Sequence, residues 1–287
     1  MPEPRAGLHL LQAIILTAVA MIAFACNSLL CRIALQQGDI DPASFASVRL
    51  VSGTIALAVI LRLRSERPAP GNADWRAAAM LFAYVVFFSF AYLSLSAGTG
   101  ALILFGAVQL TMFGAGLRAG EMFGTVAWLG LALAIAGLVY LVSPGVTAPA
   151  PFGATLMAIA GVAWGLYSLR GRGVSDPLAA TAGNFARAAP LALVLSLLFV
   201  GKANADAAGV VLAVVSGAVT SGIGYVIWYA ALRNLSAMRA ATVQLSVPPI
   251  AAVGGVIFLS ESITPRLAAA SAAILGGIAI VLLSRSR

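Results

Sequence analysis

Residues 77–117 read AAAMLFAYVVFFSFAYLSLSAGTGALILFGAVQLTMFGAGL, with no charge between Arg76 and Arg118. A helix needs about 20 apolar residues to cross the hydrocarbon core of a bilayer. These 41 residues are too many for one crossing and suit two, with a turn near the small and polar residues 96–100. The stretch predicts a pair of antiparallel transmembrane helices.

The rest of the chain has the same membrane character. Of its 287 residues, 61% are hydrophobic and 9% are charged, and the mean hydropathy is +1.02. Soluble domains carry about 25% charged residues. The net charge of +8 comes from basic residues that lie mostly singly or in pairs at helix ends. This pattern is typical of membrane topology signals and not of a nucleic-acid-binding surface.

Charges and turn residues divide the chain into ten predicted spans. The uncharged stretch 122–169 is broken near residues 143–151 and predicts two more spans. The others are expected at 10–31, 43–61, 178–200, 207–232, 240–260 and 267–284. Twelve arginines fall in the two tails and the even-numbered connections, against two or three basic residues on the other face. The positive-inside rule therefore predicts that both termini are cytoplasmic.

Residue chemistry argues against an enzyme. His9 is the only histidine and lies in the N-terminal tail, so a histidine-assisted nucleophile or a multi-histidine metal site within the membrane is excluded. Cys26 and Cys31 would lie about 140° apart around one helix, which fits neither a metal pair nor a disulfide. We expect no metal and no cofactor.

The two halves of the chain resemble each other. Asp41-Pro42 and Asp176-Pro177 are 135 residues apart, and so are Val108-Gln109-Leu110-Thr111 and Val243-Gln244-Leu245-Ser246. The predicted repeats are residues 10–142 and 152–284, with five helices each. Because five is odd, the second repeat enters the membrane inverted, which is an architecture of secondary transporters.

Several motifs resemble the EamA-type repeat of the drug/metabolite transporter superfamily. They are the Asp-Pro helix starts, Arg49 in the second helix, Gly120-Glu121, and Ser260-Glu261-Ser262-Ile263-Thr264-Pro265. Within the superfamily the chain looks most like bacterial aromatic amino-acid exporters. The resemblance implies an inner-membrane carrier that exports amino acids by alternating access. Its partners would be these substrates and lipid, without nucleic acid, and the oligomeric state is open, with a monomer among the possibilities.

Polar side chains at membrane depth are costly and are therefore candidates for substrate binding. Asn27, Gln109 and Gln244 offer amide donors and acceptors, and Arg49 and Arg187 offer a clamp for a carboxylate. The alternative for the amides is an interhelical hydrogen bond that holds the bundle together. The alternative for the arginines is a bond to backbone carbonyls.

Aromatic residues mark the equivalent third and eighth predicted helices. Tyr84 and Phe88 lie one turn apart, and Phe88 aligns with Tyr225; Trp164 lies in the sixth helix. Their depth favours the wall of a central cavity, and helix packing is the alternative. With Gln109 and Gln244 these residues form the predicted cavity.

Two further roles are predicted from local chemistry. Pro248 and Pro249 are expected to kink the ninth helix, and Gly106 is expected to loosen its counterpart, so all three are hinge candidates. Glu121 and Glu261 precede the fifth and tenth helices, where the helix dipole favours capping carboxylates.

Other cargoes on the same fold remain alternatives. An exporter of cationic drugs would need a carboxylate in the first helix, where this chain has Asn27. A nucleotide-sugar carrier would favour a lysine-rich cavity, and the chain has only Lys202, in a loop. None of the nine acids falls in mid-span, so we expect facilitated diffusion without proton coupling.

Overall fold

Helices make up the regular structure of the described residues. The computed structural model describes residues 4–64, 73–120, 122–171, 174–232 and 243–284. Eight helices are long and apolar enough to cross a membrane, and two shorter apolar helices span Trp75–Ala91 and Val247–Leu259. Their order along the chain follows the predicted spans.

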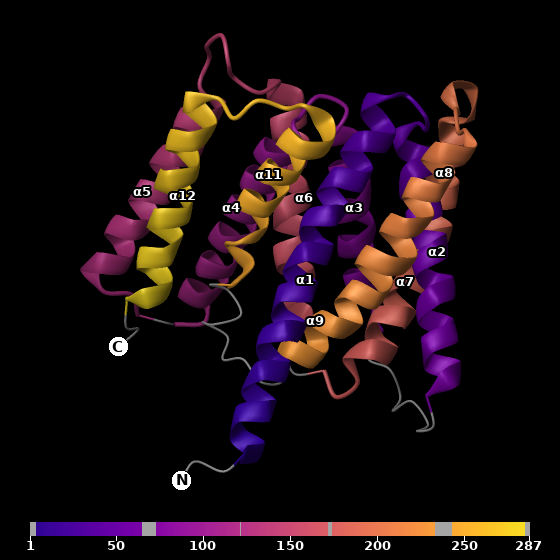
Figure 1. Cartoon of the computed structure of the whole chain (residues 1–287), viewed down its shortest axis with the longest axis horizontal. Coiled ribbons are helices and arrows are strands. Elements are labelled where there is room, and N and C mark those ends of the chain that lie inside the picture. The colour runs from indigo at the N-terminus through magenta and orange to yellow at the C-terminus, as the bar shows by residue number, and fades with distance from the viewer. Residues whose placement is uncertain (1–3, 65–72, 121, 172–173, 233–242, 285–287) are drawn as a thin grey trace.

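The helices of the first half run alternately up and down in the view of Figure 1. They are α1 (Pro4–Gln36), α2 (Pro42–Leu63), α3 (Trp75–Ala91), α4 (Ala97–Arg118) and α5 (Thr125–Val142). The Asp-Pro start of α2 is confirmed, because the Asp41 carboxylate accepts hydrogen bonds from the backbone N–H groups of Ala43 and Ser44.

The second half repeats this arrangement with more irregular helices. Its elements are α6 (Pro151–Arg170), α7 (Pro177–Leu198), the short 3-10 turn η1 (Val200–Lys202), α8 (Ala207–Val214), η2 (Val215–Ile223), α9 (Gly224–Leu232), α11 (Val247–Leu259) and α12 (Pro265–Leu283). Asp176 caps α7 as Asp41 caps α2.

The predicted eighth helix, 207–232, contains a π-helix at its centre. In η2 the backbone bonds close wider turns than in an α-helix, which places residues four and five apart on one face. Ser216, Thr220 and Ser221 face Asn27 on α1 from this segment. Hydropathy does not reveal this irregularity, because the flanking residues remain apolar.

The proline kink was predicted inside the ninth helix, 240–260, and the structure corrects this. Residues 243–244 are helical, a turn follows at 245–246, and α11 begins at Val247 with Pro248 in its first turn. A proline there lacks only an N–H that would be unsatisfied anyway. The prolines therefore set the start of α11, and residues 240–242 lie outside the described residues.

Packing between the helices follows the inverted order of the two halves. Equivalent helices contact each other directly in three pairs, α2 with α7, α4 with α11, and α5 with α12. The contact of α3 with α6 is matched by that of α9 with α1. This exchange of partners is what a pseudo-twofold axis in the membrane plane produces.

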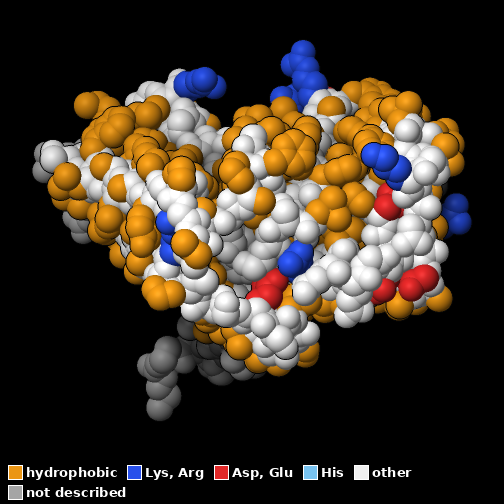
Figure 2. Space-filling model, turned by 90° about the horizontal axis from the view of Figure 1, so that it is seen from above, with side chains coloured by type: hydrophobic (Ala, Val, Ile, Leu, Met, Phe, Trp, Pro, Cys, Tyr) orange, Lys and Arg blue, Asp and Glu red, His pale blue; other side chains and the backbone are white. Residues whose placement is uncertain are grey.

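The outer surface is apolar. Leu129 on α5, Val211 on α8 and Leu283 on α12 are among many large hydrophobic side chains that are more than half exposed. Seen from the upper end of Figure 1, charged side chains are sparse and apolar ones surround the perimeter (Figure 2). Such a surface is stable in lipid and would aggregate in water.

The start of the first helix and the end of the last helix lie on the same side of the bundle. α1 begins and α12 ends at the lower side of Figure 1. We predict that reporter fusions after Arg76 and after Lys202 are found on opposite sides of the membrane, with the Arg76 fusion cytoplasmic, because the arginines favour that side. Fusions that report the same side would contradict the odd number of crossings predicted between them, and with it the inverted repeat.

Candidate substrate-binding site

A small cavity lies at the centre of the bundle, between α1, α3, α4, α6 and α9. Its lining residues are Phe24, Asn27, Ser28, Tyr84, Phe88, Leu104, Phe105, Trp164 and Tyr225. The free space is about 10 Å³, which is room for a single water molecule at most. The side chains therefore nearly fill the cavity in this conformation.

Aromatic rings form most of the cavity wall, with Trp164 in the middle. The centroid of its ring lies 4.9 Å from that of Tyr84, 5.1 Å from Tyr225 and 6.2 Å from Phe24. Phe88 continues this wall, 5.4 Å from Tyr84. Tilted and edge-on ring contacts at these distances are attractive and would also receive an aromatic or apolar ligand.

Arg49 of α2 is fully buried beside this cavity. Its Nε donates to Ser221 Oγ at 3.1 Å, and one Nη donates to the Tyr84 hydroxyl at 3.1 Å. The guanidinium carbon lies 5.3 Å from the ring centroid of Tyr84 and 5.1 Å from that of Phe88. Two cavity rings thus contact the cation directly.

The charge of Arg49 is not neutralised by any described residue. The ion pairs of the described residues are Arg32–Glu261, Arg64–Asp176 and Arg170–Asp74, and Nη1 of Arg49 has no hydrogen-bond partner among them. A buried cation ordinarily pairs with an acid or with backbone carbonyls. Nη1 of Arg49 is therefore a buried donor without a partner in the part of the chain that the structure describes.

Asn27 connects α1 to the π-helix. Its side-chain oxygen accepts hydrogen bonds from Ser216 at 2.7 Å and Thr220 at 2.6 Å, and its amide nitrogen donates to Ser221 at 3.2 Å. Ser221 in turn accepts from Arg49. The network therefore orients the guanidinium, and Asn27 has both a cavity-lining and a positioning role.

The structure brings together five of the predicted site residues and places Arg49 beside them. Asn27, Tyr84, Phe88, Trp164 and Tyr225 all line the central cavity.

The other predicted residues lie elsewhere. Gln109 is buried on α4, and Gln244 is buried on the helical turn before α11. The helices α4 and α11 pack against each other, and neither glutamine lines the cavity. Arg187 is half-buried and donates to the carbonyl of Gly183 at 3.0 Å, one turn earlier on α7. Gly106 lies within the continuous α4 and faces Leu138 of α5.

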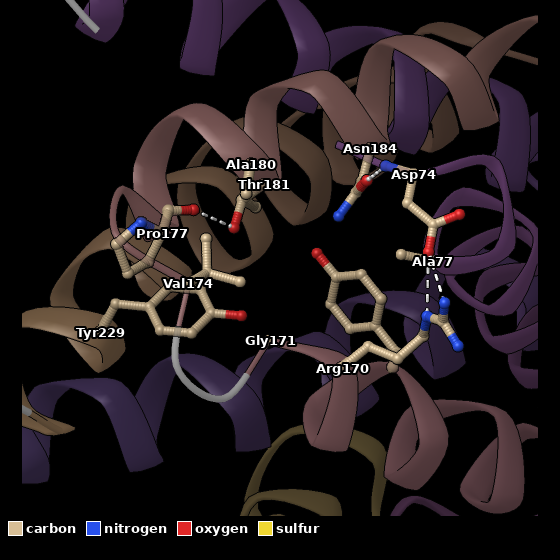
Figure 3. Close-up of a pocket in the computed structure, with 11 residues that line it drawn as sticks. Asp74, Ala77, Arg170, Gly171, Val174, Pro177, Ala180, Thr181, Asn184 and Tyr229 are labelled. Carbon is tan, nitrogen blue, oxygen red and sulfur yellow. Dashed lines mark hydrogen bonds and ion pairs between the residues drawn. The ribbon is translucent and has the colours of Figure 1, made fainter. Parts of the chain in front are cut away.

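A second cavity of about 400 Å³ opens at the lower end, between α3, α6, α7 and α9 (Figure 3). Its polar lining includes Asp74, Arg170, Thr181, Asn184 and Tyr229. The pKa of Asp74 lies below its usual value because its carboxylate accepts the Arg76 backbone N–H and pairs with Arg170. The lower cavity thus contains a permanently charged pair at neutral pH.

At the upper end, Glu261 caps a helix other than the predicted one. Its carboxylate accepts the backbone N–H of Ala97 in the first turn of α4 and pairs with Arg32 at 3.3 Å. The hydroxyl of Thr264 caps α12 instead. Glu121, the other predicted cap, lies outside the described residues. The Glu261 pair ties α1, α4 and the α11–α12 connection together, and both of its side chains line a cavity of about 400 Å³ at the upper end.

Sequence reasoning missed several polar groups at the centre. Ser216, Thr220 and Ser221 were not singled out, although the polar spacing at i, i+4 and i+5 in an otherwise apolar span was a usable signal. Asn184 was also missed. It stands 135 residues after Arg49, the offset of the Asp-Pro pairs, and is therefore its repeat equivalent.

Two sets of apolar helices packed in inverted order around a central cavity are typical of secondary transporters, which move small solutes across membranes. The chain belongs to the EamA-like transporter family, whose model matches residues 11–143 and 151–283. An uncharacterized protein of Pseudomonas aeruginosa is 52% identical over 274 residues, 96% of each chain. A protein of known crystal structure shares the fold, with a TM-score of 0.65 at 20% identity over 94% of this chain and 96% of its own.

Proposed function

We propose that this transporter is a bacterial inner-membrane carrier that exports amino acids, with a bias toward aromatic side chains, by alternating access. The observation that carries the proposal is Arg49, a buried cation that lies beside an aromatic cavity and has no counter-ion among the described residues. A substrate carboxylate would neutralise it, since arginine pairs with carboxylates through charge-assisted hydrogen bonds. The rings of Trp164 and Tyr84 would receive the side chain.

The ammonium group of the substrate needs acceptors in the same cavity. Ser28 lines it with a side-chain oxygen, and Tyr84 and Tyr225 contribute hydroxyls, whereas the Asn27 oxygen already accepts from Ser216 and Thr220. The Tyr225 hydroxyl is buried without a hydrogen-bond partner in the described structure. A bound ammonium would supply one, which removes the cost of a buried unsatisfied oxygen.

Alternating access would proceed by rearrangement of the two repeats around this cavity. The helix break at residues 245–246, which precedes Pro248 and Pro249, is the proposed hinge on the α11 side. Gly106 would be its counterpart on α4, where an added Cβ would lie 3.1 Å from the end of the Leu138 side chain.

Arg49 would also suit other small organic anions, and the test distinguishes them. Proteoliposomes loaded with unlabelled phenylalanine should exchange it for labelled phenylalanine, and for tryptophan, faster than for labelled succinate, glucose or a lipophilic cation. Exchange of succinate alone would replace amino acids by organic anions as cargo. Exchange of the lipophilic cation alone would contradict the proposed role of Arg49.

We predict that transport is facilitative. Each acidic side chain of the described residues lies at a helix end or in a connection, and Asp41, Asp74, Asp176 and Asp206 are helix caps. Arginine does not release its proton at physiological pH. A pH gradient alone should therefore not concentrate labelled phenylalanine in proteoliposomes, and pH-driven accumulation against its gradient would contradict this prediction.

A further inference from the structure

An ion pair lines the lower cavity, and its charged groups are exposed to the cavity. Arg170 Nη2 is 2.7 Å from Asp74 Oδ2, and Arg170 Nε donates to the same oxygen at 3.0 Å. Both side chains are more than a third exposed, with fractions of 39% and 36%. An exposed pair contributes little to stability, so exchanging it for other partners costs little.

The buried side of the lower cavity is polar, and Asn184 is held there by a hydrogen bond. Asn184 is buried, and its side-chain oxygen accepts the backbone N–H of Asp74 at 3.2 Å. In Figure 3 the amide nitrogen of Asn184 points into the cavity, while the Tyr229 hydroxyl faces it from the opposite wall. Asn184 thus places a polar group beside the pair, and Tyr229 places one across the cavity from it.

The position of Asn184 relates this cavity to the central one. It is the repeat equivalent of Arg49, at the same depth in α7 as Arg49 in α2. The two cavities are lined by neighbouring turns of the same two helices, with Trp164 and Tyr167 on α6 and Tyr225 and Tyr229 on α9. Trp164 and Tyr225 therefore lie one turn from the lower cavity.

We propose that the lower cavity is a second, loading site for the zwitterionic backbone of an amino acid. This inference rests on the proposed function. The amino acid would bind in the lower cavity first and would then pass Trp164 to reach Arg49. Opposite charges 2.7 Å apart match the adjacent ammonium and carboxylate groups of an α-amino acid. The ammonium would pair with Asp74 and the carboxylate with Arg170, and two new ion pairs would replace the one that opens.

The test uses tryptophan as cargo and tryptamine, which lacks the carboxylate, as a competitor. Tryptamine cannot neutralise Arg49 but can occupy Asp74. In inside-out vesicles it should inhibit tryptophan uptake by the wild type. Asp74→Asn should raise the half-saturation concentration of tryptophan about three- to tenfold and weaken tryptamine inhibition by a similar factor. Asparagine remains a good helix cap, so α3 should keep its start.

Arg170→Gln should raise the half-saturation concentration in the same way but leave tryptamine inhibition unchanged or stronger. Arg64→Gln is the matched control, because it removes an ion pair at the same end that does not line the cavity. It should leave both quantities near wild type. Ala180→Leu, which fills the cavity without touching the pair, should weaken tryptophan and tryptamine alike.

Three results would overturn the loading site. One is unchanged half-saturation and tryptamine inhibition in Asp74→Asn. Another is a lower maximal rate alone in both pair variants, which would show a structural ion pair. The third is no tryptophan transport by the wild type, which would overturn the proposed function as well. Tryptophan transport that depends on Arg49 but not on Asp74 or Arg170 would leave the proposed function standing alone.

Discussion

Replacing Arg49 with glutamine is expected to lower amino-acid transport about 100-fold without lowering the amount of protein in the membrane. A charge-assisted pair between the buried guanidinium and a substrate carboxylate contributes about 3 kcal/mol, which corresponds to about two powers of ten in affinity. Glutamine keeps an amide donor for Ser221 or Tyr84 and loses the charge. Initial counterflow rates, normalised to the abundance of each variant, would measure the effect.

The stability of this variant separates binding from a structural role. Arg49 has no acidic partner among the described residues, so its removal leaves two hydroxyls and no stranded charge. The cost of losing one partner of a buried ion pair does not arise here. Thermal unfolding of the purified variant should therefore occur within a few degrees of wild type.

Two further variants sharpen the Arg49 prediction. Arg49→Lys keeps the charge but loses the planar fork that holds both Ser221 and Tyr84, so it should retain only part of the activity. Arg187→Gln is the matched control, because Arg187 lies equally within a span but donates to a carbonyl of its own helix. Equal losses in the Arg49 and Arg187 variants would contradict a specific carboxylate site.

The parts of the fold that depend on local chemistry were predictable from the sequence. Asp41 and Asp176 start helices because a carboxylate beside a proline satisfies free N–H groups. The 41-residue uncharged stretch gave two helices separated by a turn, as its length required. The all-helical membrane character and the two repeats of the family follow from the same features, and the match to the EamA-like family confirms the resemblance.

The parts that depend on contacts between distant segments were not predictable. Glu261 caps α4, which is 164 residues away in sequence, because the α11–α12 connection folds over that helix end. Gln109 and Gln244 were paired by sequence offset, but depth alone does not say which face of a helix borders a cavity. The wide turns of η2 also depend on a distant segment, because the hydroxyls of η2 donate to Asn27 on α1.

Two arginines that the sequence places within spans have different surroundings in the structure. Arg49 and Arg187 looked alike as buried cations within spans. Their surroundings differ because Gly53 and Gly217 allow α2 to approach η2 closely, which buries Arg49 among hydroxyls and rings. Arg187 lies on a half-buried face of α7, where its own backbone is the nearest acceptor.

Replacing Gly277 with alanine is expected to destabilise the protein, although the same change at the neighbouring Gly276 should not. A Cβ at Gly277 would lie 2.5 Å from the carbonyl oxygen of Gly130 on α5, whereas one at Gly276 meets nothing within 4 Å. Backbone cannot move aside as a side chain can, so α5 and α12 must separate, at a cost of about 1–3 kcal/mol.

Alanine is expected to change the stability of the protein in opposite directions at these two glycines. Alanine at Gly276 should stabilise α12 by about 0.5–1 kcal/mol, because glycine has the greater conformational entropy to lose in a helix. Only 28% of the membrane-spanning window of α5, and of α12, is buried, so their mutual contact supplies much of what holds them. Thermal unfolding of the purified variants would measure the difference. Neither helix lines the central cavity, so transport per folded molecule should stay unchanged in both; equal unfolding temperatures would show that α5 and α12 do not depend on this backbone contact.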